Sequence, residues 1–292
     1  MSTRTGVIYR PDFHPDALRG VATAAEAAGV DELWVWEDCF QQGGIAQVAV
    51  ALAATERLAV GVGLVPAPLR NVAAAAMEFA TLEAMFPGRV RIAVGHGVQS
   101  WMRQAGAAVE SPMTLLREYA TALKALLSGA EVTVDGRYVK LSEVRLSFAP
   151  DTPLPVVIGG SGPKTLRLAG EIGDGVLVDS RYTSASMLAA LGHVSAGRAD
   201  SDTRPFSTVM FVACSPGADA SALLAEEAAR QEVPTDEGVF GVGGTTAEIV
   251  AGLAPYRDAG IDVIALQPVG PIAGISEFIT VAGDVHSQLR DA

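Results

Sequence analysis

The stretch with the clearest chemistry is a glycine-rich turn between a buried strand and a helix. Residues 155–158 form a short apolar strand, and the run Gly159-Gly160-Ser161-Gly162 ends it. A helix begins at Pro163, and proline suits a first helical position because an N–H group there has no helical acceptor. Several backbone N–H groups therefore gather at one helix N-terminus, where the glycines let an anion approach them closely.

A phosphate group is the ligand that such a turn favours. We expect the N–H groups of Ser161, Gly162 and Lys164 to bind it, with the Ser161 hydroxyl and the Lys164 charge nearby. Gly160 and Pro163 complete this cofactor-binding segment. Of the two, Pro163 has no backbone N–H group and cannot donate a hydrogen bond. The alternative is a tight strand-to-helix turn that binds nothing.

Strands and helices alternate along the whole chain of 292 residues. Eight apolar strands are expected at Gly6–Tyr9, Glu32–Trp36, Leu58–Val65, Val90–Val94, Val156–Ile158, Asp174–Val178, Phe206–Ala213 and Val263–Gln267. Expected helices include Pro15–Ala28, Ile45–Glu56, a segment from Asn71 to Met85, Ser184–Ala199, Ala218–Gln231, Thr245–Ala259 and Ile275–Leu289. A β-hairpin is expected at 132–139, because the Asp135-Gly136 dipeptide favours a two-residue turn.

This alternation predicts an α/β fold, a single (β/α)8 TIM barrel over residues 1–292 with loop and hairpin insertions. The alternative is an open doubly wound sheet, which the lack of a dinucleotide fingerprint after the first strand disfavours. A net charge of −12 argues against nucleic acid or an anionic membrane as partner. Two cysteines without metal-ligand spacing and the lack of a signal peptide or membrane-length apolar run indicate a cytoplasmic protein with no metal site.

In a barrel of this kind, chemistry gathers at the carboxyl ends of the strands. The segments there are Glu37-Asp38-Cys39, Gly63-Leu64-Val65, Gly95-His96-Gly97, Gly160-Ser161-Gly162, Asp179-Ser180-Arg181 and Gln267-Pro268. They include no metal-ligand cluster, no nucleophile elbow and no lysine placed for a Schiff base. The pattern therefore suits a cofactor that brings its own chemistry.

Several segments together resemble one protein family. They are 33–38, 56–63, 81–97 and, most specifically, 162–170 with Asp174-Gly175. Through them the chain resembles the bacterial luciferase-like monooxygenase superfamily, and more closely its branch that uses the deazaflavin F420, such as methylenetetrahydromethanopterin reductases. The resemblance implies a non-prolyl cis peptide at Gly63-Leu64, which supports the cofactor ring from behind. It also implies that the Gly95-His96-Gly97 segment contributes to the cofactor site.

The resemblance further implies that Asp38 lies near the ring and the substrate. Some relatives carry a catalytic histidine directly after this acid, where this chain has Cys39, and some carry an acid where this chain has Val98. Both departures argue against sugar-phosphate dehydrogenation by that mechanism. His96 then ranks first as proton donor, Asp38 second and Cys39 last. The alternative for His96 is a packed or capping residue without a catalytic role, and the alternative for Asp38 is a solvated carboxylate at a strand end.

Aromatic and basic residues near the barrel mouth complete the set of candidates. Trp101, in an expected loop over 98–110, is a candidate for substrate binding, whereas Trp36 is expected in the core. Arg70, Arg103 and Arg181 could contact the acidic tail of a deazaflavin, and the default interpretation is that they are solvated surface charges.

These features predict an F420-dependent oxidoreductase that transfers a hydride between the cofactor and a small-molecule substrate. The alternatives are an FMN-dependent monooxygenase, since FMN also ends in phosphate, and a non-catalytic cofactor-binding barrel. The identity of the substrate and the direction of transfer are not readable from the sequence, and a homodimer is left open.

Overall fold

Parallel strands close into a barrel in the computed structural model, which describes residues 3–199, 202–234, 238–270 and 274–291. Within these residues the barrel strands are β1 (Arg4–Tyr9), β2 (Glu32–Val35), β3 (Ala59–Pro66), β4 (Val90–Gly95), β7 (Val156–Gly159), β8 (Gly175–Val178), β9 (Ser207–Pro216) and β11 (Val263–Pro268). The order is β9-β11-β1-β2-β3-β4-β7-β8, and a pairing of β8 with β9 closes it. The predicted (β/α)8 barrel is confirmed.

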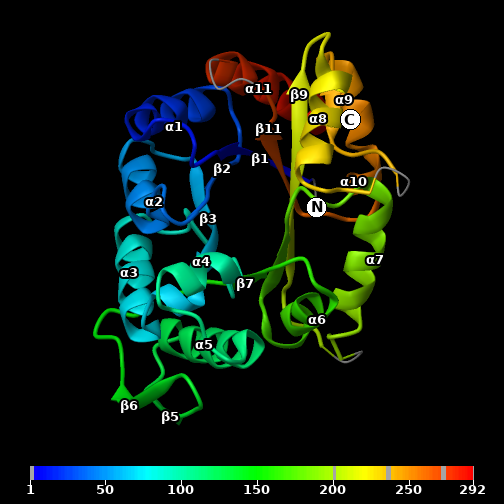
Figure 1. Cartoon of the computed structure of the whole chain (residues 1–292). Coiled ribbons are helices and arrows are strands. Elements are labelled where there is room, and N and C mark those ends of the chain that lie inside the picture. Colours follow the sequence, from blue (N-terminus) through cyan, green and yellow to red (C-terminus); the bar gives the residue numbers. More distant parts are fainter. Residues whose placement is uncertain (1–2, 200–201, 235–237, 271–273, 292) are drawn as a thin grey trace.

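Most of the helices surround the strands on the outside of the barrel, whereas α4 lies at its mouth (Figure 1). They are α1 (Leu18–Ala27), α2 (Gly44–Ala53), α3 (Val72–Met85), α4 (Gln99–Gln104), α5 (Pro112–Leu127), α6 (Pro163–Ile172), α7 (Ser184–Ser195), α8 (Ala220–Arg230), α9 (Thr246–Gly252), α10 (Ala254–Asp258) and α11 (Ile275–Asp291), with 3-10 turns at Pro15–Ala17 and Ala67–Leu69. Side-chain caps set several starting points: Asn71 accepts from the Ala73 N–H group and Ser111 from that of Thr114. Helices α1, α2, α3, α5, α6, α7 and α10 each lead into the next strand of the chain.

Three elements differ from the sequence expectation. A short helix, α4, replaces part of the loop expected after β4. The single helix expected over 245–259 is divided into α9 and α10 at Leu253, because Pro255 cannot donate the hydrogen bond that a continuous helix needs. A further strand, β10 (Val242–Gly244), pairs with the end of β9 outside the closed barrel.

The expected hairpin is present, but its turn is not the predicted one. Strands β5 (Val132–Asp135) and β6 (Lys140–Val144) are separated by four residues, and Gly136 does not take the positive φ of a two-residue turn. The Glu118 carboxylate accepts hydrogen bonds from the N–H groups of residues 137, 138 and 139, at 2.8–3.0 Å. A side chain of α5 therefore holds the wider loop, and the hairpin projects beyond α5 (Figure 1).

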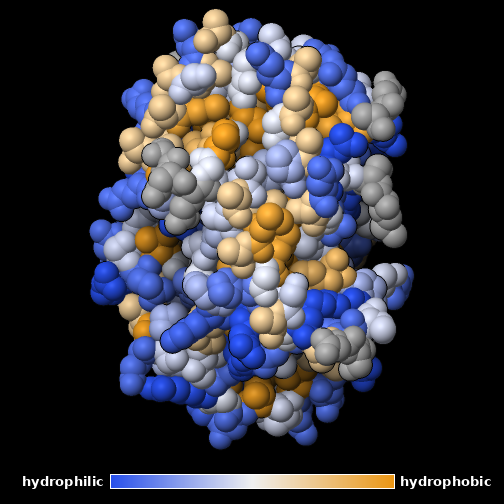
Figure 2. Space-filling view, turned by 90° about the vertical axis from the view of Figure 1, so that its right-hand side faces the viewer, coloured by the Kyte–Doolittle hydropathy of each residue, from blue (hydrophilic) through white to orange (hydrophobic). Residues whose placement is uncertain are grey.

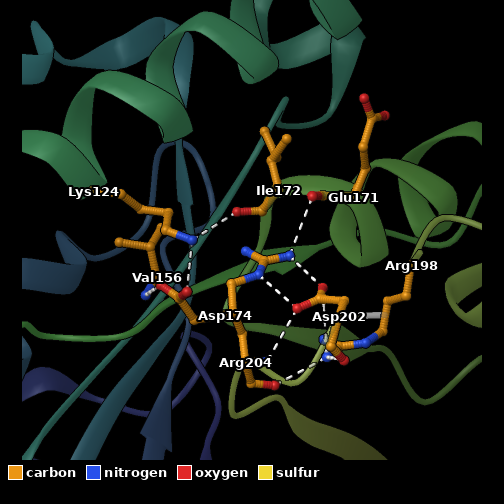
Figure 3. Close-up of polar contacts among 8 residues, drawn as sticks. All are labelled: Lys124, Val156, Glu171, Ile172, Asp174, Arg198, Asp202 and Arg204. Carbon is orange, nitrogen blue, oxygen red and sulfur yellow. Dashed lines mark hydrogen bonds and ion pairs between the residues drawn. The ribbon is translucent and has the colours of Figure 1, made fainter. Parts of the chain in front are cut away.

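A polar cluster fixes the amino ends of β7 and β8 (Figure 3). Asp174, just before β8, accepts a hydrogen bond from the Val156 N–H group at 3.0 Å and pairs with Lys124 Nζ at 2.6 Å. Nearby, Arg204 binds Asp202 through both Nε and Nη2, and this contact lowers the pKa of Asp202 to about 2. These ion pairs hold the end of the barrel opposite the functional site.

Hydrophobic side chains fill the barrel interior in one layer. Its members are Ile8, Trp34, Ala93, Val157, Leu177, Val209, Phe211, Val263 and Ala265. Side chains on a strand point to alternate faces, so the inward-facing residue nearer the carboxyl end lies two positions further on. On six of the strands that residue is Arg10, Trp36, Gly95, Gly159, Asp179 or Gln267. This upper layer forms the floor of the site.

Candidate active site

A cavity of about 490 Å³ opens at the carboxyl ends of the barrel strands. Its lining combines apolar side chains, a run of glycines and several charged groups. The lining residues that matter for function are Trp36, Asp38, Gly63, Leu64, His96, Gly97, Trp101, Gly160, Ser161 and Gln267. Cavities of this size and composition typically bind small molecules and cofactors.

Glycines make one half of the cavity flat and leave room for Leu64. A Cβ atom added at Gly95 or at Gly159 would lie 2.6 Å from Leu64 Cδ2, so the Leu64 side chain packs directly against both backbones. The Gly63-Leu64 peptide bond is cis, as the family resemblance implies. The pairing of β3 with β4 changes register between Val62 and Val65, at the same place. Leu64 therefore forms an apolar platform over β4 and β7, and Gly95 supports it without lining the cavity.

The glycine-rich turn after β7 borders this platform. Gly160 and Ser161 line the cavity, whereas Gly162, Pro163 and Lys164 are exposed at the start of α6. The N–H group of Gly160 is used, since it donates to Leu177 O at 3.2 Å. Within the described residues no acceptor is found for the N–H groups of Ser161, Gly162 and Lys164.

Neighbouring side chains stabilise the turn and add charge to it. Arg181 Nη2 donates to Ser161 Oγ at 2.9 Å, and the Tyr182 hydroxyl donates to the Ser161 carbonyl. A Cβ atom added at Gly162 would meet nothing within 4 Å, so the space above this residue is open. The turn thus presents three N–H donors that have no acceptor among the described residues, an arrangement that suits an anion, and the neighbouring Arg181 guanidinium is itself paired with Asp179.

His96 enters the cavity from the end of β4 with both ring nitrogens engaged. Nδ1 lies 3.1 Å from the Gly97 carbonyl, which can only accept, so Nδ1 carries the hydrogen in this contact. In the neutral ring Nε2 is then an acceptor, and the hydroxyl of Thr165 lies 3.3 Å from it. The sequence reasoning overlooked Thr165, which is buried in the first turn of α6. No local pattern reveals it, because the contact joins residues far apart in the chain.

Asp38 and Cys39 follow β2 but differ in their access to the cavity. Asp38 lines it, and burial, with a smaller effect from Asp12, raises the pKa of the Asp38 carboxyl. Cys39 is half-buried and is not among the lining residues. Burial and the charges of Glu37 and Asp38 raise the pKa of its thiol, which therefore stays protonated near neutral pH. The structure brings Asp38 and His96 to one cavity and leaves Cys39 at its edge.

The arginines expected near the rim fall into different positions. Arg70 is held by two carboxylates, Glu37 with an Nη2 to Oε2 distance of 2.8 Å and Glu78 at 3.5 Å. Arg103 is exposed on α4, outside the lining. Only Arg181 of the three candidates lines the cavity. The acidic-tail role expected for Arg70 is therefore not supported by its position.

Two tryptophans and Phe211 are the aromatic residues among the described lining of the cavity, and one of the tryptophans changes its expected place. Trp101 lines it from α4, not from a loop. Trp36, expected in the core, is half-buried and forms part of the floor, where its ring stacks on Phe211 with centroids 6.3 Å apart. Trp34 on β2 and Trp36 directly after this strand are two positions apart, and this spacing is the signal that both rings face the interior. The sequence does not show that the apolar layer ends between them.

A second and larger cavity lies over the ends of β9, β10 and β11 and is lined by both apolar and polar residues, including residues of α8 and α11. Hydrophobic residues also gather in the upper part of the face that carries α9 (Figure 2).

In the described part of the chain no group of three or more His, Cys, Asp or Glu residues is placed to bind a metal. Among the same residues, no helix has the length and apolar character needed to cross a membrane.

Comparison with known proteins identifies relatives with the same architecture. A family model described as luciferase-like monooxygenase matches residues 1–235. A 5,10-methylenetetrahydromethanopterin reductase of Methanolobus tindarius is 28% identical over 177 residues, 61% of this chain and 54% of the relative. An F420-dependent glucose-6-phosphate dehydrogenase of Beutenbergia cavernae is 34% identical over 183 residues, 58% of this chain and 54% of the relative. The chain thus spans about half the length of these curated relatives.

A solved structure supports the same fold over the whole chain. It is an F420-dependent secondary alcohol dehydrogenase in complex with an F420-acetone adduct, with a TM-score of 0.84 and 22% identity, covering 100% of both chains. At this level of identity the likeness shows the barrel and its connections.

Proposed function

Because the chain belongs to the luciferase-like monooxygenase family, we propose that it is an F420-dependent oxidoreductase acting on a small organic substrate. The relatives named as F420-dependent enzymes support the choice of cofactor. The observation that carries the proposal is the Leu64 platform beside three N–H groups for which the described part of the chain provides no acceptor. An aromatic ring system whose side chain carries a phosphate needs both an apolar surface and an anion site.

The residues present fit such a cofactor. Leu64, Gly63 and Gly97 would lie against the ring, and the N–H groups of Ser161, Gly162 and Lys164 would hold the phosphate. When bound, a deazaflavin supplies or accepts the hydride. The protein contributes a flat apolar surface, a fixed anion site and groups that move a proton.

His96 is the group best placed to move a proton at the substrate oxygen. In its neutral ring Nε2 is an acceptor, with the Thr165 hydroxyl 3.3 Å away. Once a substrate hydroxyl replaces that contact, the ring can take the proton of an alcohol that is oxidised, and the protonated ring can return it to a carbonyl that is reduced. Asp38 is the second candidate, because its raised pKa brings the neutral, donating form closer to physiological pH. Cys39 ranks last, since its thiol has a raised pKa and lies outside the cavity lining.

The test is a comparison of two cofactors on the purified protein. Fluorescence titration with F420 and with FMN gives the two dissociation constants, and single-turnover spectra with a panel of small alcohols and ketones then follow hydride transfer. We expect tight binding of F420 and a change in its spectrum with one member of the panel. Preferential binding of FMN would reject F420 as the cofactor and favour the monooxygenase alternative. Binding of F420 without any turnover would favour a cofactor-binding barrel.

A further inference from the structure

Two buried polar atoms in the floor of the cavity have no hydrogen-bond partner among the described residues. They are Nε1 of Trp36 and Oε1 of Gln267, whose side chain is 3% exposed. Buried polar groups are almost always paired, because leaving one unpaired costs free energy. The six other side-chain atoms of this kind belong to residues outside the lining of this cavity. The pair therefore needs an explanation that belongs to the site.

Both atoms lie on the half of the barrel that does not carry Leu64. Trp36 follows β2 and Gln267 ends β11, and these two strands flank β1 on either side. Gln267 lies two positions after Ala265, which faces the interior, so it faces inward as well. The stacking of Trp36 on Phe211 at an interplanar angle of 20° fixes the direction of the indole ring. A donor and an acceptor thus remain on the side where a substrate would meet the cofactor ring.

The charges around the cavity are already balanced. Of the described residues, three arginines line it, and each is paired with a carboxylate: Arg10 with Asp12, Arg181 with Asp179 and Arg230 with Glu227, at 2.5–2.6 Å. A phosphate or carboxylate on the substrate would find no unpaired cation in this lining. Asp38, which also lines the cavity, would repel an anion in its ionised form.

We propose that Trp36 and Gln267 recognise an uncharged substrate, with Trp36 Nε1 donating to its oxygen and Gln267 Oε1 accepting from its hydroxyl or amide hydrogen. This inference rests on the proposed function, because it takes the Leu64 side of the cavity to be the cofactor side. The substrate class is a small neutral alcohol, carbonyl or carboxamide, and phosphorylated sugars and free acids are excluded. Trp36 and Gln267 are binding residues that set specificity, whereas His96 and Asp38 face the reacting oxygen.

The test uses two isosteric probes, isobutyramide and isobutyrate, which differ in charge and in the presence of N–H donors. Their dissociation constants are measured by titration calorimetry with and without saturating F420, for the unsubstituted protein and for Trp36→Phe and Gln267→Leu. Each substitution removes the polar group and keeps an apolar side chain of similar shape. Ser215→Ala is the matched control, because Ser215 Oγ is also buried without a hydrogen-bond partner in the described part of the chain but lies at the other cavity.

We expect isobutyramide to bind at least tenfold more tightly than isobutyrate. Trp36→Phe and Gln267→Leu should each weaken isobutyramide roughly 3- to 10-fold, the range for one hydrogen bond. The dissociation constant for F420 should stay within about twofold, and Ser215→Ala should change neither constant.

Three results would overturn the inference. Equal affinity of the unsubstituted protein for the two probes would reject discrimination against charge. The two residues would be rejected as substrate contacts if the unsubstituted protein did not bind isobutyramide, or if both variants bound it with unchanged affinity. A loss of F420 affinity in the variants would assign the two atoms to the cofactor. Failure of the unsubstituted protein to bind F420 rejects the proposed function separately, and the probe series without cofactor still tests the two residues.

Discussion

Replacement of Gly162 by valine separates cofactor binding from folding. The backbone of Gly162 has φ −81° and ψ 147°, a conformation that valine adopts readily, and its added Cβ would meet nothing within 4 Å. Replacing a glycine in a compatible conformation restricts the unfolded chain and raises the free energy of unfolding by about 0.4–1 kcal/mol. The variant should therefore be at least as stable as the parent protein.

The same side chain should obstruct the phosphate site. Hydrogen bonds to a charged group contribute about 1.5–3 kcal/mol each, so loss of one of the three N–H contacts weakens binding at least about tenfold. Loss of two contacts weakens it at least about a hundredfold. Gly162→Ala is the matched control, and we expect an intermediate effect because its side chain is smaller.

Two measurements on the same samples decide the outcome. Fluorescence titration gives the dissociation constant for F420, and urea unfolding followed by circular dichroism gives the free energy of unfolding. An unchanged dissociation constant would refute the assignment of the turn as the phosphate site. A lower free energy of unfolding would refute the claim that the space above Gly162 is empty.

Three further changes test other parts of the structure. Gly95→Ala places a Cβ 2.6 Å from Leu64 Cδ2, and we expect a loss of about 1–3 kcal/mol in urea unfolding; an unchanged midpoint would show that Leu64 does not pack there. Asp202 has a pKa of about 2, below its ordinary value of 3.8, so its contribution to stability is present above pH 4 and is lost as the pH falls toward 2. Arg204→Met should therefore flatten the fall in melting temperature between pH 5 and pH 2, and a parallel fall in both proteins would contradict this. Burial raises the pKa of the Asp38 carboxyl, so the ionised form destabilises the folded protein. Asp38→Asn should therefore increase the melting temperature more at pH 7 than at pH 4. An equal increase at both pH values would argue against a perturbed carboxyl.

The barrel was predictable because its signals are local. Each strand is a short apolar run bounded by glycine, proline or a cap, and the carboxyl ends of these runs fix where Asp38, His96 and Ser161 lie relative to the sheet. The cis bond at Gly63-Leu64 followed from the family resemblance, since no local physical signal demands it. The single domain, the cytoplasmic location and the homodimer stay predictions.

The errors arose where distant residues decide local structure. The hairpin turn is set by Glu118 on α5, which replaces the local preference of Asp135-Gly136 with three hydrogen bonds. The expected core position of Trp36 is wrong, because strand alternation shows which face a residue takes but not how far the apolar layer extends. The sequence does not separate Cys39 from Asp38, because adjacent residues share a strand end, although only Asp38 is among the residues that line the cavity.

Thr165 connects features that the sequence presents separately. Its N–H group donates to the Gly162 carbonyl at 2.9 Å, which closes the turn at the start of α6, and its hydroxyl lies 3.3 Å from His96 Nε2. A Cβ added at Gly160 would lie 2.5 Å from Thr165 Cγ2, so the glycine is required by this side chain as well as by the approach of an anion. The anion site and the imidazole are therefore held by one residue. A ligand that shifts the first turn of α6 would also move the hydroxyl that occupies Nε2, the atom through which His96 exchanges its proton.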